Sequence, residues 1–374
     1  MKIKSKKIYD LKEGFVDKEL YVDGARFAED ASDSQVLDFK DCYVIPGLTD
    51  LHFHGAVGED VSDADPQGLR KMADFELHEG VTQICPASMT LGADTLLEIT
   101  SMLPQSKKET EGEELAELVG LNLEGPFLSY KKRGAQNPDF LQAPNIELLK
   151  ELYETSDKLC KLVTIAPELE GSDEFIKEAS KFIRVSVGHT TAQYDCAKKA
   201  FDLGARHVTH MFNAMPPFHH RDPAVIGAAN ENEAVSAELI CDLIHIHESA
   251  IRASFKMFGA GRIVMISDSC RGAGMPDGQY TLGGQIIVVG DHIARLESGT
   301  IAGSVTSLMN CLRNVVGIGI PLEDAVRASA YNPAKAIGID KDYGSLEPGK
   351  IANFVVLDKN LKTQAIFLNG QEIS

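Results

Sequence analysis

The chain has 374 residues, of which 44% are hydrophobic and 25% are charged, and its formal net charge is −18 at pH 7. This length exceeds one typical domain, so we expect a large domain with a buried core and a smaller domain beside it. The negative charge repels nucleic acids and anionic membranes, which excludes both as partners, and a small anionic substrate would need a local cationic pocket.

The start of the chain and its cysteines indicate a cytoplasmic protein. The opening MKIKSKKIYD is basic but lacks the apolar run of a signal peptide, and no stretch approaches 18 uncharged apolar residues. Seven cysteines are scattered without a Cys-x-x-Cys spacing, which argues against a disulfide framework. We therefore predict a cytoplasmic location.

Short alternating segments at both ends predict one small β domain. Residues 1–46 contain KELYVDG and SQVLDFKDCYVIPG between Gly and Asp turn signals, and residues 341–374 contain ANFVVLD and AIFLNG. We interpret the two segments as the N- and C-terminal parts of a small β-sandwich domain built from both termini. Residues 47–340 would then form an inserted catalytic domain.

Residues 47–340 alternate strand-length apolar runs with helix-length amphipathic segments. For example, PQGLRKMADFELHEG precedes VTQICPA, and FIRVSVGHT precedes TAQYDCAKKAFDLGA. This alternation implies a parallel sheet with helical crossovers. Because about eight such units fit the segment, we predict an α/β fold with a TIM-like (β/α)8 metal-dependent hydrolase barrel, whose catalytic groups lie at the C-terminal ends of the strands.

Polar residues follow the apolar runs where these strands would end. In PGLTDLHFHG two histidines lie one residue apart, so an extended chain would project both imidazoles to one side. The full set is His52, His54, Glu124, His189, His210 and Asp268. Each also has a structural interpretation, because the carboxylates could cap helices and the later histidines could be hydrogen-bonded core residues.

Several imidazoles and two carboxylates at one barrel mouth are typical of a Zn or Fe type metal site with an open position for water. Such a metal lowers the pKa of its water and polarises a carbonyl, which indicates hydrolysis. A carboxylate beside the metal can accept the proton of the water and return it to a leaving amine. Asp268 is the candidate, because its strand is nearest the closure of the ring.

The order His-x-His, Glu, His, His, Asp resembles the amidohydrolase superfamily, and the surrounding segments resemble its N-acetylglucosamine-6-phosphate deacetylase family. The match extends from Pro46 to the last strands of the chain, with LEGPF and FNAMP as its most specific parts. The other matching segments are PGLTDLHFHG, KRGAQNP, VGHT, PPFHHRDPAVIGAA, DLIHIH, ISD, AGSVTSL and GSLEPGKIANFVVLD. This resemblance implies deacetylation of N-acetyl-D-glucosamine 6-phosphate, in amino-sugar catabolism and cell-wall recycling, by a homodimer.

The resemblance also implies a role for each site residue. The principal metal ligands would be Glu124, His189 and His210, with Asp268 as general base and acid, while His52 and His54 would give the capacity for a second divalent ion. The substrate contacts that it implies are Gln136, Asn213, the backbone of Ala214, and Arg221 with His245 on the phosphate. Gln136 stands where some members have a histidine that contacts the acyl carbonyl, and its amide can still donate a hydrogen bond there.

The remaining histidines and the basic run have structural interpretations. We expect a solvated or lid role for His219 and His220, and a structural or exposed position for His78, His207, His247 and His292. The run Lys131, Lys132 and Arg133 is typical of a solvated loop, although one of its members could screen an incoming phosphate. The Gly-rich residues 272–284 predict a flexible active-site loop and a β-hairpin.

Two other functions compete with this interpretation. One is an amidohydrolase for a different N-acyl compound or cyclic amide, which a substrate panel would reveal. The other is a non-catalytic sugar-phosphate sensor on the same barrel. A sensor would lack the proton shuttle or the ligands, and all of these residue types are present in the sequence.

Overall fold

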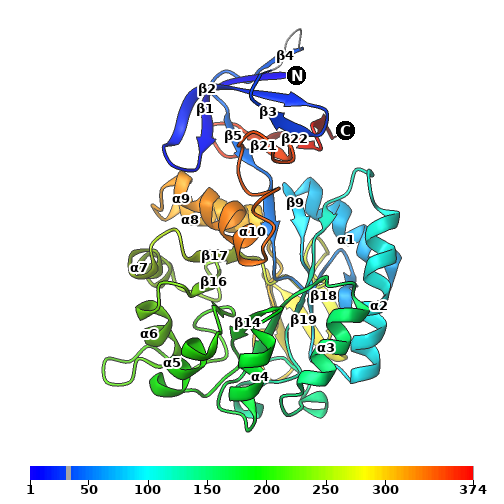
Figure 1. Ribbon diagram of the computed structural model, residues 1–374, viewed down its shortest axis with the longest axis vertical. Coiled ribbons are helices and arrows are strands. Elements are labelled where there is room, and N and C mark those ends of the chain that lie inside the picture. Colours follow the sequence, from blue (N-terminus) through cyan, green and yellow to red (C-terminus); the bar gives the residue numbers. More distant parts are fainter. Residues whose placement is uncertain (31–34, 374) are drawn as a thin grey trace.

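A barrel with a β-sheet beyond one of its ends makes up the computed structural model, which describes residues 1–30 and 35–373 (Figure 1). Residues 31–34 and 374 belong to the predicted terminal β segments and lie outside the described residues. No helix in the described ranges combines the length and the apolarity needed to cross a membrane.

Eight strand positions form the barrel among the residues that the structure describes, and two of them are interrupted. They are β6 (Leu48–Asp50), β9 (Val81–Ile84) continued by β10 (Ala87–Ser88), β11 (Glu117–Leu118) continued by β12 (Leu121–Leu123), β13 (Cys160–Ile165), β14 (Arg184–Val187), β15 (His207–Val208), β16 (Ser236–Ile240) and β17 (Ile263–Ile266). Every pairing between them is parallel. The strands are buried almost throughout, as expected when helices cover a parallel sheet.

The ring closes where the last strand meets the first. The amide of Asp268, just after β17, donates to the carbonyl of His52, just after β6, at 2.9 Å. The buried carboxylate of Asp50 also joins these two strands, because it accepts hydrogen bonds from the amides of His52 (3.1 Å) and Ser267 (3.2 Å). The C-terminal ends of the first and last strands are therefore held side by side.

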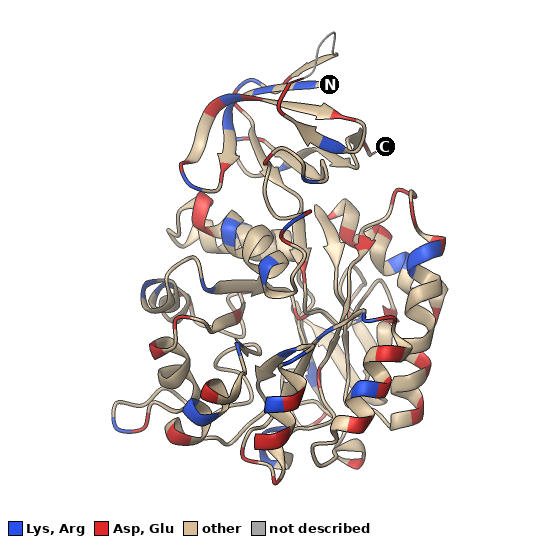
Figure 2. Cartoon of the chain, in the orientation of Figure 1, with Lys and Arg blue, Asp and Glu red and all other residues tan. Residues whose placement is uncertain are grey.

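Helices lie outside the barrel and alternate with its strands. They are α1 (Pro66–His78), α2 (Ala93–Glu109), α3 (Ile146–Thr155), α4 (Ser172–Ala179), α5 (Tyr194–Leu203), α6 (Ala224–Glu231), α7 (Glu248–Phe258) and α8 (Leu308–Gly317). Side-chain caps fix several of their starts, such as Asp65 on α1 and Asn145 on α3. Figure 2 shows acidic and basic residues interspersed along these outer helices.

The N-terminal end of the barrel is closed by a helical segment that follows α8. It consists of α9 (Leu322–Val326), the π-helical η4 (Arg327–Tyr331) and α10 (Asn332–Ala336). Buried residues of α10 pack with barrel side chains such as Leu51, Leu162 and Val264. These contacts pack part of the N-terminal end, and the catalytic groups of such a barrel are expected at the opposite end.

The strands of both termini pair in one mainly antiparallel sheet. Its strands are β1 (Lys2–Asp10), β2 (Gly14–Asp23), β3 (Arg26–Ala28), β4 (Val36–Asp38), β5 (Tyr43–Pro46), β21 (Phe354–Leu357), β22 (Thr363–Leu368) and β23 (Gln371–Glu372). The sheet curls until Arg26 bridges Ile351, next to β21. The rings of Phe354 and Phe367 stack at 4.2 Å in its core. The predicted α/β barrel with a second β unit from both termini is confirmed, and the domain boundaries stay a prediction.

Short strands and turns surround the open end of the barrel. A three-stranded antiparallel sheet of β18 (Gly278–Leu282), β19 (Gln285–Gly290) and β20 (Ile293–Leu296) follows β17, so the predicted hairpin is present. The remaining short elements are β7 (Gly55–Ala56), β8 (Glu59–Asp60), η1 (Val61–Asp63), η2 (Tyr130–Lys132) and η3 (Pro138–Phe140).

Candidate active site

Three side chains from three strand ends meet at the open end of the barrel. Glu124 follows β12, His189 follows β14 and His210 follows β15. The Oε1 atom of Glu124 lies 3.0 Å from Nε2 of His189 and 2.8 Å from Nε2 of His210. The two Nε2 atoms are 2.9 Å apart. All three residues are buried, and the spacing of their ligand atoms could hold a metal ion.

A second such group shares the same carboxylate. His52 and His54, after β6, place their Nε2 atoms 3.5 Å from Oε1 and 3.3 Å from Oε2 of Glu124, respectively. Both imidazoles are buried and point to one side, as their spacing predicts. Glu124 therefore belongs to both groups and could bridge two ions.

Hydrogen bonds at Nδ1 orient three of the four imidazoles. The Nδ1 atom of His54 lies 2.9 Å from the carbonyl of Ala87, and that of His189 lies 2.9 Å from the carbonyl of Lys132. Because a carbonyl can only accept, Nδ1 carries a proton in both rings, and Nε2 is the ring nitrogen that faces Glu124. His52 has the corresponding contact with a carboxylate, Glu238, at 2.9 Å. This arrangement is the one that metal-binding histidines usually have.

Glu238, a residue that sequence reasoning missed, connects several parts of the site. It lies on β16, fully buried, and its Oε1 atom is 3.0 Å from Nε2 of His207. Its Oε2 atom accepts the backbone N–H of His210 at 2.9 Å besides contacting His52. The sequence does contain a signal for this residue, because a glutamate inside the apolar segment SAELI would be buried, and a buried carboxylate needs polar partners.

The electrostatics of the site favour a cation. Burial opposes a charged imidazole at His54, but hydrogen bonds to Asp268 and Glu124 outweigh it and raise its pKa to about 10. The Nε2 atom of His52 is buried without a hydrogen-bond partner among the described residues. A negative field that attracts protons also attracts a divalent ion, and an orphaned Nε2 atom is a free ligand. The residues present therefore fit a divalent metal.

Asp268 completes the ring of site residues. Its Oδ1 atom lies 3.3 Å from Nε2 of His54 and 3.8 Å from Nε2 of His52. Its backbone is left-handed, with φ of 48°, and the same is true of His189 (47°) and His210 (25°). Such values are uncommon for residues with a Cβ, and strain of this kind concentrates at functional sites.

A cavity of about 550 Å³ opens over these residues, which is a usual size for a small-molecule site. Of the predicted substrate contacts, Gln136, Asn213, Ala214 and His245 line it. Lys131, Lys132 and Arg133, which the sequence suggested to be a solvated loop, also line it. Thr300, Ile301 and Gly303, after β20, form another part of its wall that sequence reasoning missed.

Gln136 is held between the site and the barrel. Its amide nitrogen donates to Oε2 of Glu124, and its oxygen accepts from the amide of Thr90 at 2.7 Å. An amide nitrogen carries two protons, so one remains for a substrate carbonyl. The side chain of His245 is nearly buried, with Nδ1 2.7 Å from Oδ2 of Asp242, which leaves Nε2 for a ligand.

Arg221 lies apart from the other predicted site residues. It is exposed, its Nη1 atom is 2.8 Å from Nε2 of His220, and it does not line the cavity of its own chain. Within residues 1–30 and 35–373, no ion pair joins its guanidinium to Asp222. The structure therefore does not bring Arg221 to the other site residues within one chain.

Comparison with known proteins identifies the class of this chain. Residues 43–373 match the model of the Amidohydrolase family, so the chain belongs to this metal-dependent family, as the resemblance predicted. N-acetylglucosamine-6-phosphate deacetylase of Lysinibacillus sphaericus is 35% identical over 321 residues, which cover 85% of this chain and 82% of the relative. N-acetylgalactosamine-6-phosphate deacetylase of Escherichia coli O157:H7 is 34% identical over 87% of this chain and 86% of its own length.

Solved structures of the same kind superpose over the whole chain. A mutant of N-acetyl-D-glucosamine-6-phosphate deacetylase from Mycobacterium smegmatis, in complex with N-acetyl-D-glucosamine-6-phosphate, has a TM-score of 0.92 and 30% identity, covering 100% of this chain and 98% of that one. The N-acetylglucosamine-6-phosphate deacetylase of Thermotoga maritima has a TM-score of 0.90 and 29% identity, covering 100% and 99%. The similarity therefore includes both the barrel and the terminal sheet.

Glu238 should act as a positioning residue for the metal site. We expect Glu238→Gln to lower the affinity for a divalent ion by about 10–100-fold, the usual effect of losing a carboxylate behind a metal-binding histidine. Competition with a chelator would measure the affinity. Glu233→Gln, at an exposed glutamate nearby, is the matched control. Unchanged affinity in a folded Glu238→Gln protein would show that Glu238 does not position these ligands.

Proposed function

We propose that this chain is the enzyme that hydrolyses the acetamide of N-acetyl-D-glucosamine 6-phosphate, giving D-glucosamine 6-phosphate and acetate. The observation that carries this proposal is the buried group of Glu124, His189 and His210 with Asp268 beside it, in a chain that matches deacetylases of this substrate over most of its length. We place the reaction in amino-sugar catabolism and cell-wall recycling, in the cytoplasm.

The proposed metal ligands are the two groups that share Glu124. Glu124, His189 and His210 would hold the principal ion, and His52 and His54 would provide for a second one. A bound ion of the Zn or Fe type would polarise the acetamide carbonyl and activate a water molecule. Contacts of the Nδ1 atoms with Ala87, Lys132 and Glu238 fix the orientation of three of the imidazoles.

Asp268 would move the protons of the reaction. Its carboxylate would accept a proton from the attacking water and return it to the nitrogen that leaves as the amine. Position supports this role, because Oδ1 faces His54 and the side chain lines the cavity. The free amide proton of Gln136, together with the metal, would stabilise the negative charge that develops on the carbonyl oxygen.

The rest of the cavity would bind the sugar and its phosphate. Asn213 and the backbone of Ala214 would contact the sugar, and His245 would contact the phosphate. Arg221 would join His245 from a neighbouring subunit of a homodimer, because in its own chain it lies outside the cavity wall. The basic residues Lys131 and Arg133 in the wall give a local positive field on a chain whose net charge is −18.

The C4 epimer is a second candidate substrate. The relative from Escherichia coli is named for N-acetylgalactosamine 6-phosphate and is nearly as similar as the N-acetylglucosamine-6-phosphate deacetylases. Both reactions use the same acetamide chemistry and differ only in the contact with the 4-hydroxyl. Acetate release from each sugar phosphate tests the proposal, and we expect a higher kcat/KM for the glucosamine derivative. A higher value for the galactosamine derivative would reverse the assignment, and hydrolysis of neither would contradict the proposed function.

Removal of the metal should abolish turnover. We expect protein freed of metal by a chelator to be inactive and to recover when Zn or Fe type ions are added. His189→Ala should be more damaging than His52→Ala, because His189 belongs to the principal group. Metal content, measured by elemental analysis, and acetate release would be compared for both variants. Full activity in protein shown to be metal-free contradicts this prediction.

The loss of the Asp268 carboxylate should lower kcat while substrate binding is largely kept. Asp268→Asn retains the shape of the side chain but removes its basicity, so we expect kcat to fall by about 10²–10⁴-fold. Steady-state kinetics on the metal-loaded variant would measure this. Asp63→Asn, at a carboxylate paired with Arg271, is a suitable control. Near-normal kcat in Asp268→Asn would assign the proton transfer to another group.

Phosphate recognition should depend on Arg221. A guanidinium can grip phosphate with two parallel hydrogen bonds, each contributing about 1.5–3 kcal/mol. We therefore expect Arg221→Ala to lower kcat/KM for the phosphorylated sugar by about 10²–10⁴-fold and to leave the slow reaction of plain N-acetylglucosamine unchanged. Equal losses on both sugars, or a wild type that handles both within about threefold, would show that Arg221 does not recognise phosphate.

A further inference from the structure

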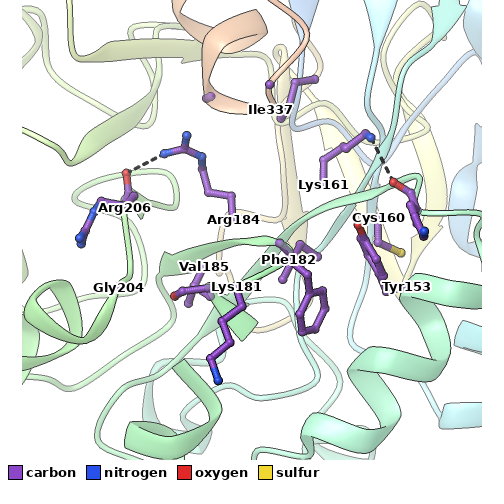
Figure 3. Close-up of a pocket in the computed structure, with 15 residues that line it drawn as sticks. Tyr153, Cys160, Lys161, Lys181, Phe182, Arg184, Val185, Gly204, Arg206 and Ile337 are labelled. Carbon is purple, nitrogen blue, oxygen red and sulfur yellow. Dashed lines mark hydrogen bonds between the residues drawn. The ribbon is translucent and has the colours of Figure 1, made fainter. Parts of the chain in front are cut away.

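A second cavity, of about 370 Å³, lies at the opposite end of the barrel from the candidate active site. Its wall is formed where β13, β14 and β15 begin, by the end of α3, and by the end of α10 (Figure 3). The strand β14 separates the two sites: Arg184 at its start lines this cavity, and His189 beyond its end belongs to the active site. At about 3.3 Å per residue, five residues place them roughly 16 Å apart.

The wall of this cavity is strongly basic. It contains five cationic residues, which are Lys158, Lys161, Lys181, Arg184 and Arg206. Among the described residues that line it, none is Asp or Glu. This composition is opposite to that of the chain, which has 55 acidic and 37 basic residues. The cavity is therefore a local positive site on a negative protein.

Most of these cations have no anionic partner in the described part of the chain. Across the described residues, Lys158, Lys161, Arg184 and Arg206 make no ion pair, and only Lys181 has one, with Glu178. The half-buried guanidinium of Arg184 reaches only the carbonyl of Arg206, at 3.4 Å (Figure 3). Burial, followed by the charge of Arg206, lowers the pKa of Arg184. Such desolvated cations are costly unless an anion compensates them.

An arginine with a structural role, Arg262, shows how the protein backbone can satisfy a guanidinium that has no ion pair. Within residues 1–30 and 35–373, Arg262 makes no ion pair either, but its guanidinium donates to five backbone carbonyls, including those of Phe258, Ala229 and Asn230. Its positive charge is therefore satisfied by the fold. Arg184 has one long contact instead, so its guanidinium retains donors for a ligand.

The remaining wall of the cavity is apolar. The rings of Tyr153 and Phe182 lie 4.9 Å apart, and Ile183, Val185 and Ile337 complete this side. A small organic molecule with an anionic group would find cations for its charge and an apolar surface for its carbon skeleton. The exposed side chains of Lys158 and Lys181 leave the cavity accessible from solvent.

We propose that this cavity is a binding site for a small phosphorylated metabolite, separate from the active site. Residues with guanidinium and ammonium groups line one cavity whose described wall residues include no carboxylate, and these are the groups that bind a phosphoryl dianion. The cavity is large enough for a sugar phosphate or a smaller phosphate ester. The proposal does not depend on the reaction at the other end of the barrel.

Calorimetric titration of the metal-loaded protein tests the proposal, with inorganic phosphate, glucose 6-phosphate and unphosphorylated glucose as probes. Lys161→Gln/Arg184→Gln removes two unpaired cations. Lys198→Gln/Arg252→Gln, the matched control, removes two surface cations that are paired with Asp202 and Glu248. We expect the wild type and the control to bind glucose 6-phosphate at this site, and the first variant to bind it at least about tenfold more weakly and with one site fewer.

The probes separate the possible sources of the anion. Binding of inorganic phosphate in the same pattern assigns recognition to the phosphoryl group alone, and binding of glucose 6-phosphate only assigns it to the ester; both outcomes support the site. Equal stoichiometry and affinity in the wild type and in Lys161→Gln/Arg184→Gln would overturn it, as would equally tight binding of glucose. If that variant does not fold, Lys158→Gln/Lys181→Gln, at two exposed positions, replaces it under the same criteria.

Discussion

The structure depends on one buried carboxylate. Glu124 lies between the Nε2 atoms of four histidines, two from one strand end and two from two others, at distances of 2.8 to 3.5 Å. A carboxylate so far from water is stable only with cationic or hydrogen-bonding partners. The strand ends must therefore converge, and the barrel is the fold that lets distant segments of the chain do so.

Because the strand ends converge, several site residues have strained backbones, and hydrogen bonds hold them in place. His189, His210 and Asp268 have left-handed backbones, and residues with a Cβ adopt them only when their surroundings impose them. Glu238 is one such constraint, because it binds the backbone N–H of His210 and the ring of His52. Backbone hydrogen bonds between Asp268 and its neighbours His52 and Ser304 are another. The site is thus held by the barrel strands together with the segments above them, such as the turn that contains Lys132.

Basic residues are concentrated in cavities at the two ends of the barrel. The chain as a whole repels anions at long range, although salt at cellular levels screens this beyond about 8 Å. Cations gather in the walls of two cavities, with Lys131, Lys132 and Arg133 at the open end and Arg184 among those at the opposite end. Anion binding is therefore a local property of these cavities. At the opposite end, the guanidinium of Arg184 makes no ion pair among the described residues and lies beside the apolar wall of the cavity.

Sequence alone determined the order of the elements and the principal residues of the site, because both follow from local patterns. Apolar runs alternating with amphipathic segments predicted the barrel, and polar residues that follow several of these runs marked His52, His54, Glu124, His189, His210 and Asp268. Local patterns do not predict which residues from distant segments of the chain lie close together in the fold. Only the tertiary structure decided that Glu238 supports two of these histidines, that Lys131 lines the cavity while Arg221 does not, and that unpaired cations gather at the other end. Each of these depends on contacts between residues far apart in the chain, which packing brings together.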